Sequence, residues 1–162
     1  MTEDFIRNQA FMSLGSRLKR LGERMQADVQ RLAKAEGFDT PTGLIPTVAI
    51  LGERETMSIG ALAEALGVSQ PGATRNIAQL AALGLVSEKW DRRDKRVKTA
   101  SLTAKGKVLF RHVESNLGPR VAQAVEALCG SGRHEFLATL ASIEDGLDAA
   151  PLDERASKQQ EQ

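Results

Sequence analysis

Two adjacent hydrophobic patterns near the middle of the chain predict a pair of short helices. The apolar residues of the first pattern are Ile59, Leu62, Ala63 and Leu66. They recur with the i, i+3, i+4, i+7 spacing of a helix that has one buried face. Gly67 follows, and a glycine at this place can adopt the left-handed conformation in which helices often end. The first helix is therefore expected to stop at a tight turn.

The second helix of the pair has a capping residue and a polar side. Ser69 offers a side-chain oxygen as N-cap, and Pro71 falls in the first turn, where its missing N–H costs little. The apolar side is formed by Ala73, Ile77, Leu80 and Leu83. The other side carries Gln70, Gly72, Thr74, Arg75 and Asn76. Two short helices joined by a tight turn form the helix-turn-helix pattern.

A strand-like pattern follows the second helix. Two extended runs, 85–90 and 97–103, flank a polar turn and predict a β-hairpin. Between Glu88 and Lys98 there are six basic and three acidic residues, a local charge of +3, whereas the whole chain has a net charge of only +1. Any contact with nucleic acid must therefore come from a local patch such as this hairpin. A helix-turn-helix followed by a basic hairpin is a winged helix.

This stretch resembles the MarR family of winged-helix transcriptional regulators. The resemblance rests on the spacing of the two helices, on the Gly-Leu-Val step at 84–86, and on an Asp-Arg-Arg-Asp-x-Arg wing at 91–96 that leads to Leu-Thr-x-x-Gly at 102–106. It extends over roughly residues 10–148 and is strongest from 58 to 106. It implies a mainly α fold with a small β-hairpin wing (α+β), in which a winged helix-turn-helix is flanked by N- and C-terminal dimerisation helices.

The resemblance also implies a function and partners. It implies a sequence-specific DNA-binding transcriptional regulator, expected to be a repressor, that acts as a homodimer on a palindromic operator in double-stranded DNA. If helices from both ends of the chain pair across a two-fold axis, two recognition helices are held at a fixed separation, as a palindromic duplex requires. Members of the family often hold small ligands beside the DNA-binding lobe, so a small-molecule effector is a further candidate partner.

The flanking segments show helical periodicity. Residues 5–35 carry an apolar stripe with steps of three and four, formed by Phe11, Leu14, Leu18, Leu21, Met25, Val29 and Leu32. Such a stripe packs along another helix, and we interpret it as an intrachain core face, a subunit interface or both. Beyond the hairpin, helical segments are expected over 103–128, interrupted or kinked near 118–119, and over about 133–148.

These elements divide the chain into four parts. Residues 1–36 form an N-terminal helix of the dimerisation region, and residues 40–103 form the winged helix-turn-helix lobe. Residues 104–148 complete the dimerisation region, and residues 149–162 are expected to be a disordered polar tail. Within the lobe, Pro46 leaves two alternatives, because proline disrupts a helix interior. The helix there is either a longer one with a kink or a shorter one that begins near Pro46.

The residues expected to contact DNA lie in the second helix and in the hairpin. The helix contributes Ser69, Gln70, Gly72, Ala73, Thr74, Arg75 and Asn76. Gln and Asn can pair with adenine and Arg with guanine, each for about 1–3 kcal/mol of discrimination. Gly72 and Ala73 permit a close backbone approach, and Ser69 can combine capping with a phosphate contact. The hairpin contributes Arg92, Arg93, Asp94, Lys95, Arg96 and Lys98.

Roles within the wing follow partly from the resemblance. The family's Asp-x-Arg motif implies that Arg96 enters the minor groove, with Asp94 bracing it or the turn. The other basic side chains are expected to neutralise phosphates, which gives affinity and salt dependence rather than sequence choice. Two residues keep alternative interpretations. Arg75 could instead pair with Glu64, and Trp90 is expected to pack against the lobe rather than stack on sugar or phosphate.

Other chemistry is weakly indicated. The sequence has no recognisable nucleophile–base pair, glycine-rich phosphate loop or Cys/His cluster with zinc spacing, so no enzyme activity, cofactor or metal site is expected. The single cysteine, Cys129, excludes an intramolecular disulfide and is expected to be buried and inert. No run approaches the ~20 apolar residues of a membrane span, so a cytoplasmic protein without membrane contact is expected. The alternative function is a winged-helix module that docks an acidic protein partner and binds DNA only non-specifically.

Overall fold

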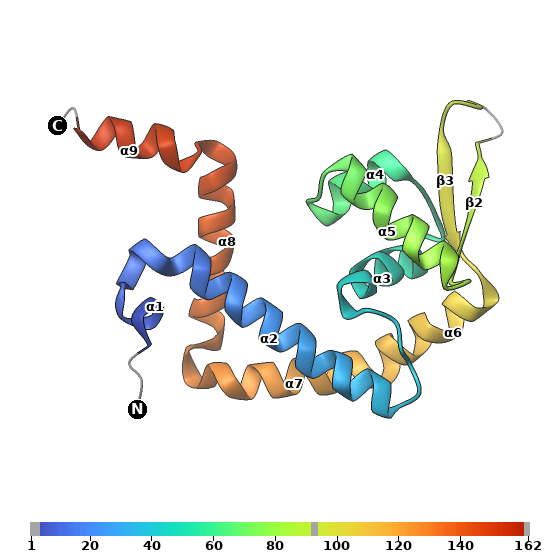
Figure 1. Ribbon diagram of the computed structural model, residues 1–162, viewed down its shortest axis with the longest axis horizontal. Helices are drawn as coiled ribbons and strands as arrows, with labels where there is room; N and C mark the ends of the chain where they lie inside the picture. The colour runs from blue at the N-terminus through green and yellow to red at the C-terminus, as the bar shows by residue number, and fades with distance from the viewer. Residues whose placement is uncertain (1–3, 92–93, 161–162) are drawn as a thin grey trace. The chain divides into compact units, whose positions relative to one another are not determined.

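The computed structural model describes residues 4–91 and 94–160 and is mostly helical, with one small antiparallel sheet (Figure 1). The chain divides into two units, the first ending at Pro119 and the second beginning at Arg120. Among the described helices, none is both long enough and apolar enough to cross a membrane. The helix pair and the hairpin both belong to the first unit.

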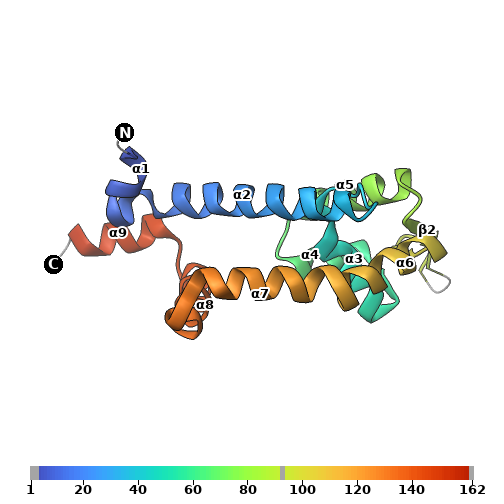
Figure 2. The ribbon, with the colours of Figure 1, turned by 90° about the horizontal axis from the view of Figure 1, so that it is seen from below.

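The first unit contains all the strands and most of the helices. Its elements are α1 (Phe5–Asn8), the 3-10 helix η1 (Ala10–Ser13), α2 (Leu14–Ala35), the 3-10 helix η2 (Thr42–Leu44), α3 (Ile45–Arg54), β1 (Thr56–Ser58), α4 (Ile59–Leu66), α5 (Gln70–Ala82), β2 (Val86–Trp90), β3 (Lys98–Leu102), α6 (Ala104–His112) and the π-helical turn η3 (Val113–Leu117). The helix α2 is a single long rod, seen lengthwise in Figure 2. The winged lobe runs from η2 to α6.

A hydrophobic core joins α3, α4, α5, α6 and the sheet of the lobe. Its fully buried apolar side chains are Val48, Leu51, Leu62, Ile77, Leu80 and Leu109. Of the inward-facing positions predicted for the helix pair, Leu83 is exposed, Ile59 and Leu66 are half-buried, and the remaining five are buried, namely Leu62, Ala63, Ala73, Ile77 and Leu80. Each such side chain contributes about 1.5–3 kcal/mol relative to an exposed one, so α5 is fixed firmly through its apolar side.

The turn between α4 and α5 forms as its residues dictate. Gly67 has a φ of 62°, in the left-handed region. The Ser69 hydroxyl accepts a hydrogen bond from the Gly72 N–H at 3.2 Å, and Pro71 lies in the first turn of α5. The predicted helix-turn-helix is therefore confirmed, and the cap fixes the residue at which α5 begins.

The sheet contains one strand more than the sequence predicted. β2 and β3 pair antiparallel, with Val86 opposite Leu102 and Trp90 opposite Lys98, which confirms the hairpin. β1 pairs with the other edge of β3, giving the order β1-β3-β2. Three residues are too few to show a period-two pattern, which is why the sequence did not reveal β1.

The N-terminal segment differs from the single helix predicted over 5–35. Ala10 has a φ of 47°, a left-handed conformation that interrupts an α-helix, so α1 and η1 precede α2. The prediction was wrong before Leu14. α1 is attached to α2 by Asp4, whose two carboxylate oxygens accept hydrogen bonds from Arg20 at 3.0 and 2.9 Å.

Two prolines lie where a helix can accept them. α3 begins at Ile45 with Pro46 in its first turn, so the shorter of the two predicted helices is the one that forms. Near Pro119 the helix does not stop. The Gly118 N–H bonds to the Val113 carbonyl in a wide π-helical turn, which carries the chain from α6 into α7 past the proline.

The second unit continues α7 (Gly118–Cys129) and contains the 3-10 helix η4 (Gly130–Gly132), α8 (Arg133–Ala149) and α9 (Leu152–Gln160). The prediction of a disordered tail over 149–162 was wrong as far as residue 160. The Arg155 guanidinium donates hydrogen bonds to the carbonyls of Gly146 and Ala150, which holds α9 to the end of α8. The tail is polar, but most of its residues are good helix formers.

Cys129 is half-buried rather than buried.

Candidate nucleic-acid interface

The helix α5 has one buried side and one exposed side. Its inner side chains, Ala73, Ile77 and Leu80, lie in the core. Its N-terminal half presents Gln70, Thr74 and Arg75 to solvent. Because the inner side fixes the helix, these polar groups project from a rigid base. Such an exposed, polar helix N-terminus is what insertion into a major groove requires.

The Arg75 side chain is available to contact a ligand. Among the residues that the structure describes, it forms no hydrogen bond and no ion pair, so the alternative pairing with Glu64 is not formed. The Thr74 hydroxyl donates to the Gln70 carbonyl at 2.9 Å and keeps its lone pairs available as acceptors. The exposed half of α5 therefore offers a guanidinium, a primary amide and a hydroxyl.

The other residues predicted at this helix end are engaged within the lobe. Asn76 donates from Nδ2 to the Thr47 hydroxyl at 3.4 Å, and Thr47 is 0% exposed. Ala73 is buried, and the Ser69 side chain caps the helix. A Cβ at Gly72 would lie 3.3 Å from Ser69 Oγ, so glycine suits the crowded cap. Their contact with DNA stays a prediction, and for Asn76 it would require loss of the bond to Thr47.

The wing turn is shaped by its own acidic residues. The Asp94 carboxylate accepts a hydrogen bond from the Arg96 backbone N–H at 2.9 Å and lies 3.4 Å from Arg96 Nε. The Asp94 N–H in turn donates to Asp91 Oδ1 at 3.0 Å. Asp94 thus braces both the turn and Arg96, whose side chain is 92% exposed. Lys95 is exposed, whereas Arg92 and Arg93 lie outside the described residues.

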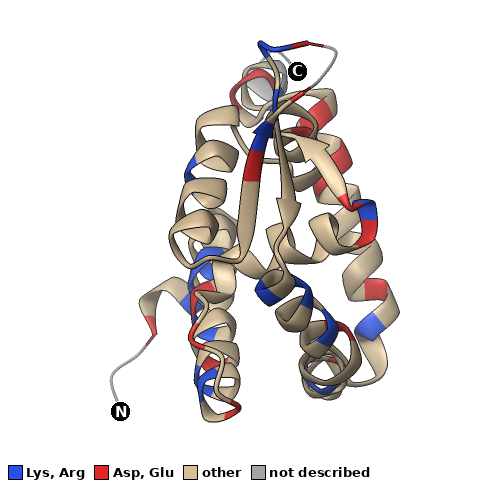
Figure 3. Cartoon of the chain, turned by 90° about the vertical axis from the view of Figure 1, so that its right-hand side faces the viewer, with Lys and Arg blue, Asp and Glu red and all other residues tan. Residues whose placement is uncertain are grey.

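Trp90 occupies a position that the sequence interpretation did not favour. Its expected packing against the lobe is not found, because the residue is 58% exposed at the end of β2. Lys98 Nζ lies 5.2 Å from the centre of the Trp90 ring, in cation–π geometry, and 3.4 Å from Glu88 Oε2. Both basic and acidic residues therefore occupy the outer part of the hairpin, as Figure 3 shows.

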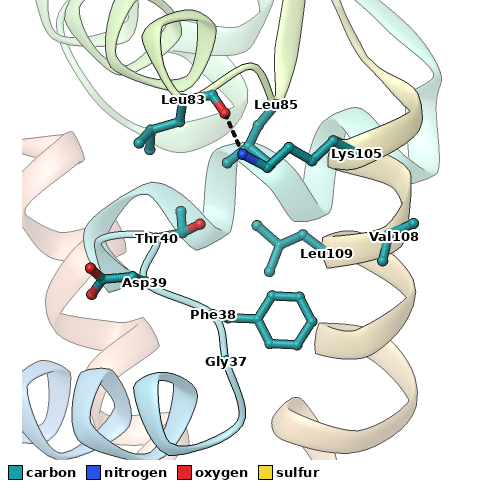
Figure 4. Close-up of a pocket in the computed structure, with 9 residues that line it drawn as sticks. All are labelled: Gly37, Phe38, Asp39, Thr40, Leu83, Leu85, Lys105, Val108 and Leu109. Atoms are coloured by element: carbon teal, nitrogen blue, oxygen red, sulfur yellow. Dashed lines mark hydrogen bonds between the residues drawn. The ribbon is translucent and has the colours of Figure 1, made fainter.

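A small cavity lies next to the C-terminal end of α5. It measures about 290 Å³ and is lined by Gly37, Phe38, Asp39, Thr40, Leu83, Leu85, Lys105, Val108 and Leu109 (Figure 4). Lys105 Nζ donates to the Leu83 carbonyl at 2.9 Å, and the Thr103 hydroxyl donates to the Gly84 carbonyl at 2.7 Å. The start of α6 therefore holds the C-terminal end of α5. Sequence reasoning missed this cavity because its walls come from three separate segments.

A buried pair joins the end of α2 to the end of α6. His112 Nε2 lies 2.8 Å from Glu36 Oε2 without the alignment of a hydrogen bond, and both side chains are largely buried. The Phe38 ring stacks on the imidazole with ring centres 4.1 Å apart. This contact orients the loop that forms one wall of the cavity.

Comparison with known proteins gives a family-model match to part of the chain and a shared fold. The model of the MarR family matches residues 45–97. The S. aureus MepR–DNA complex has a TM-score of 0.69 and 20% identity, covering 80% of this chain and 94% of that one. A mutant of MarR from E. coli in complex with operator DNA has a TM-score of 0.70 and 16% identity, covering 87% and 97%. A MarR transcriptional regulator from Methanosarcina mazei Go1 has a TM-score of 0.65 and 22% identity, covering 85% and 98%.

Proposed function

We propose that the chain is a MarR-family winged-helix protein and that it is a sequence-specific DNA-binding transcriptional regulator. The observation that carries the proposal is the two-sided character of α5. Its inner side is locked into the core, while Gln70, Thr74 and Arg75 project outward. In the same lobe, the braced wing extends Arg96 into solvent. The two elements suit a major groove and its neighbouring minor groove.

We further propose that the protein acts as a homodimer. In the first unit, Phe11 is 89% exposed, close to the exposed Phe5 and Met12. In the second unit, Leu128 is 84% exposed, and Leu137 is exposed as well. Large apolar side chains that are exposed to this degree favour burial against another protein surface. A second copy of the chain would cover them and would pair two recognition helices for a palindromic site.

Selection from a random duplex pool at physiological salt tests both parts of the proposal. The purified protein is expected to enrich an inverted repeat whose half-sites lie about one helical turn apart. Enrichment of isolated half-sites would support sequence-specific binding but contradict the proposed homodimer. A pool without enrichment would favour the alternative, a protein-docking module whose DNA binding ignores sequence and disappears by ~200 mM salt.

The proposed direction of regulation is repression. A dimer bound to an operator that overlaps a promoter excludes polymerase sterically. A reporter driven by a promoter that carries the enriched site should therefore be expressed less when the protein is present. A reporter that rises in the presence of the protein would identify an activator instead.

We also propose that a small molecule modulates DNA binding through the cavity behind α5. Lys105 donates a hydrogen bond to the backbone carbonyl of Leu83 at the C-terminal end of α5. A ligand in the cavity that displaces the lysine would therefore loosen this end of the helix. Val108→Trp at the cavity wall is expected to abolish ligand-induced changes in melting temperature while leaving DNA binding in place. A ligand that still raises the melting temperature of the Val108→Trp variant would show that the effector binds outside this cavity.

A further inference from the structure

One face of the hairpin passes continuously from the core into solvent. Side chains alternate along a strand, so Val86, Glu88 and Trp90 lie on one face of β2. Their partners in the register are Leu102, Ala100 and Lys98. Val86, Ala100 and Leu102 belong to the same buried cluster as the α5 residues Ile77 and Leu80. Glu88, Trp90 and Lys98 therefore extend the face of the sheet against which the recognition helix packs.

The outer end of this face contains an aromatic ring, a cation and an anion in contact. Trp90 is mostly in water, although a tryptophan gains much from burial. Lys98 Nζ lies over its ring at 5.2 Å and is 3.4 Å from Glu88 Oε2. Both charged side chains are partly exposed, and an ion pair in water is weak. Lys98 can therefore exchange its carboxylate for a stronger anionic partner at little cost.

Duplex geometry indicates what this face would meet. One sugar–phosphate strand separates the major groove from the adjacent minor groove. If the N-terminal half of α5 enters the first and Arg96 approaches the second, the strand between them crosses the surface between helix and wing. That surface is the outer end of the face that carries Trp90 and Lys98. An indole offers a flat apolar surface for deoxyribose and one N–H donor for a phosphate oxygen.

We propose that Trp90 and Lys98 form a docking site for the DNA backbone between the two grooves, and that Glu88 holds Lys98 in position until a phosphate replaces it. The proposal rests on the DNA-binding function proposed above and adds two contacts and an exchange to it. Trp90 lies against the sugar, and the Lys98 ammonium moves from the Glu88 carboxylate to a phosphate oxygen. These are backbone contacts, so they position the protein without reading sequence.

The wild-type protein provides a direct test, because Trp90 is the only tryptophan in the chain. Its emission and its quenching by acrylamide are measured during titration with the duplex enriched from the random pool, while anisotropy of a labelled copy reports binding. Saturation with duplex is expected to change the emission and to protect the ring from acrylamide. Full binding with unchanged emission and unchanged quenching would overturn the docking site and leave the DNA-binding function standing.

Two lysines of the hairpin provide a matched pair for mutation. Lys98 lies on the docking face, and Lys89 lies on the opposite face of the same hairpin. Lys98→Ala is expected to weaken binding about tenfold and to lower the slope of log affinity against log salt by about one, as loss of one phosphate contact does. Lys89→Ala should have a much smaller effect. Equal effects of the two variants would overturn the assignment to this face.

The aromatic contact has its own variants. Trp90→Ala is expected to weaken binding about tenfold. Trp90→Phe keeps a flat ring but lacks the N–H, so its affinity should lie between those of the wild-type protein and Trp90→Ala. Unchanged melting temperatures would show that the loss is not a folding defect. Wild-type affinity in Trp90→Ala would overturn the tryptophan contact, and the fluorescence titration decides the matter even if this variant folds poorly.

The exchange step is tested by a double-mutant cycle. Glu88→Gln frees Lys98 and is expected to tighten binding about threefold. In the Lys98→Ala background the same change should have no effect, because no lysine remains to be released. If Glu88→Gln tightens DNA binding just as much in the Lys98→Ala protein, Glu88 acts only by repelling the phosphates. That result would overturn the proposed exchange. If the wild-type protein binds no duplex at all, the proposed function fails and the docking site fails with it.

Discussion

At the scale of single residues, Gly106 shows how closely α6 approaches the turn that follows α5. A Cβ placed on Gly106 would lie 2.1 Å from the Leu85 carbonyl oxygen and 3.2 Å from Leu102 Cδ2. No side chain fits between these atoms unless the backbone moves. The absence of a Cβ therefore allows the start of α6 to hold the end of α5.

Substitution of Gly106 is expected to destabilise the lobe. Gly106→Ala should lower the free energy of unfolding by about 1–3 kcal/mol, the usual range for overpacking, as measured by urea denaturation. Gly60→Ala is the control, because a Cβ there meets nothing within 4 Å in α4 and should stabilise the protein by about 0.5–1 kcal/mol. Equal stability of the two variants would contradict the close approach.

Asn76 and Gln70 separate a structural role from a binding role within one helix. Asn76→Ala deprives the buried Thr47 hydroxyl of its partner and should cost about 1–2 kcal/mol of stability, seen as a lower melting temperature. Gln70→Ala changes an exposed side chain and should leave the melting temperature unchanged while weakening binding to the enriched duplex. Loss of stability in the Gln70 variant alone would reverse these assignments.

At the scale of elements, the sequence predicts best where a local signal and the core agree. Ser69 and Gly67 define the turn between α4 and α5 through capping and left-handed geometry, and both predictions are confirmed. The break at Ala10 has no such signal, because alanine rarely adopts the left-handed conformation and the neighbouring residues carry no turn pattern. The position of Trp90 was missed for a similar reason, since a strand-end tryptophan has no pattern that distinguishes packing from exposure.

The attachment of α1 to α2 should depend on pH. The Arg20 guanidinium bonded to Asp4, with help from the Arg7 N–H, holds the pKa of that carboxyl below its usual value of 3.8. Because the pKa of Asp4 is lower in the folded protein than in the unfolded chain, the attachment is fully present when the pH is above the unfolded-state pKa. It is lost as the pH falls through the folded-state pKa. Hydrogen exchange of α1 amides, corrected for intrinsic rates, should therefore accelerate as the pH falls below the usual carboxyl pKa of 3.8.

Asp4→Asn is the control for this titration. The amide cannot ionise, so α1 in this variant should exchange rapidly at every pH and show no transition. A transition of the same size in both proteins would mean that another group controls the attachment.

At the scale of the whole molecule, the exposed apolar residues of both units support the homodimer proposed above. Phe11 is the most exposed of those that the structure describes, and burial against another protein surface would shield it from water. Because a palindromic site is bound by two lobes, disruption of the pairing should weaken DNA binding even though no DNA contact is changed.

Phe11→Glu is expected to convert the dimer to a monomer in analytical ultracentrifugation. Its affinity for the inverted repeat should fall to its affinity for a single half-site, while the melting temperature of the winged lobe should stay unchanged. Gln26→Glu adds the same charge to an exposed position of α2 near Thr42 and should remain dimeric. A dimeric Phe11→Glu protein would remove the N-terminal segment from the subunit interface.

The division of α5 into a buried and an exposed side has an evolutionary consequence. Residues that keep the helix in place, such as Ile77 and Leu80, are separate from residues that would choose the target, such as Gln70 and Arg75. Mutations of the second kind do not touch the core, so they are nearly neutral for folding. After gene duplication, one copy could therefore drift to a new operator in a few steps while each intermediate remains a folded protein.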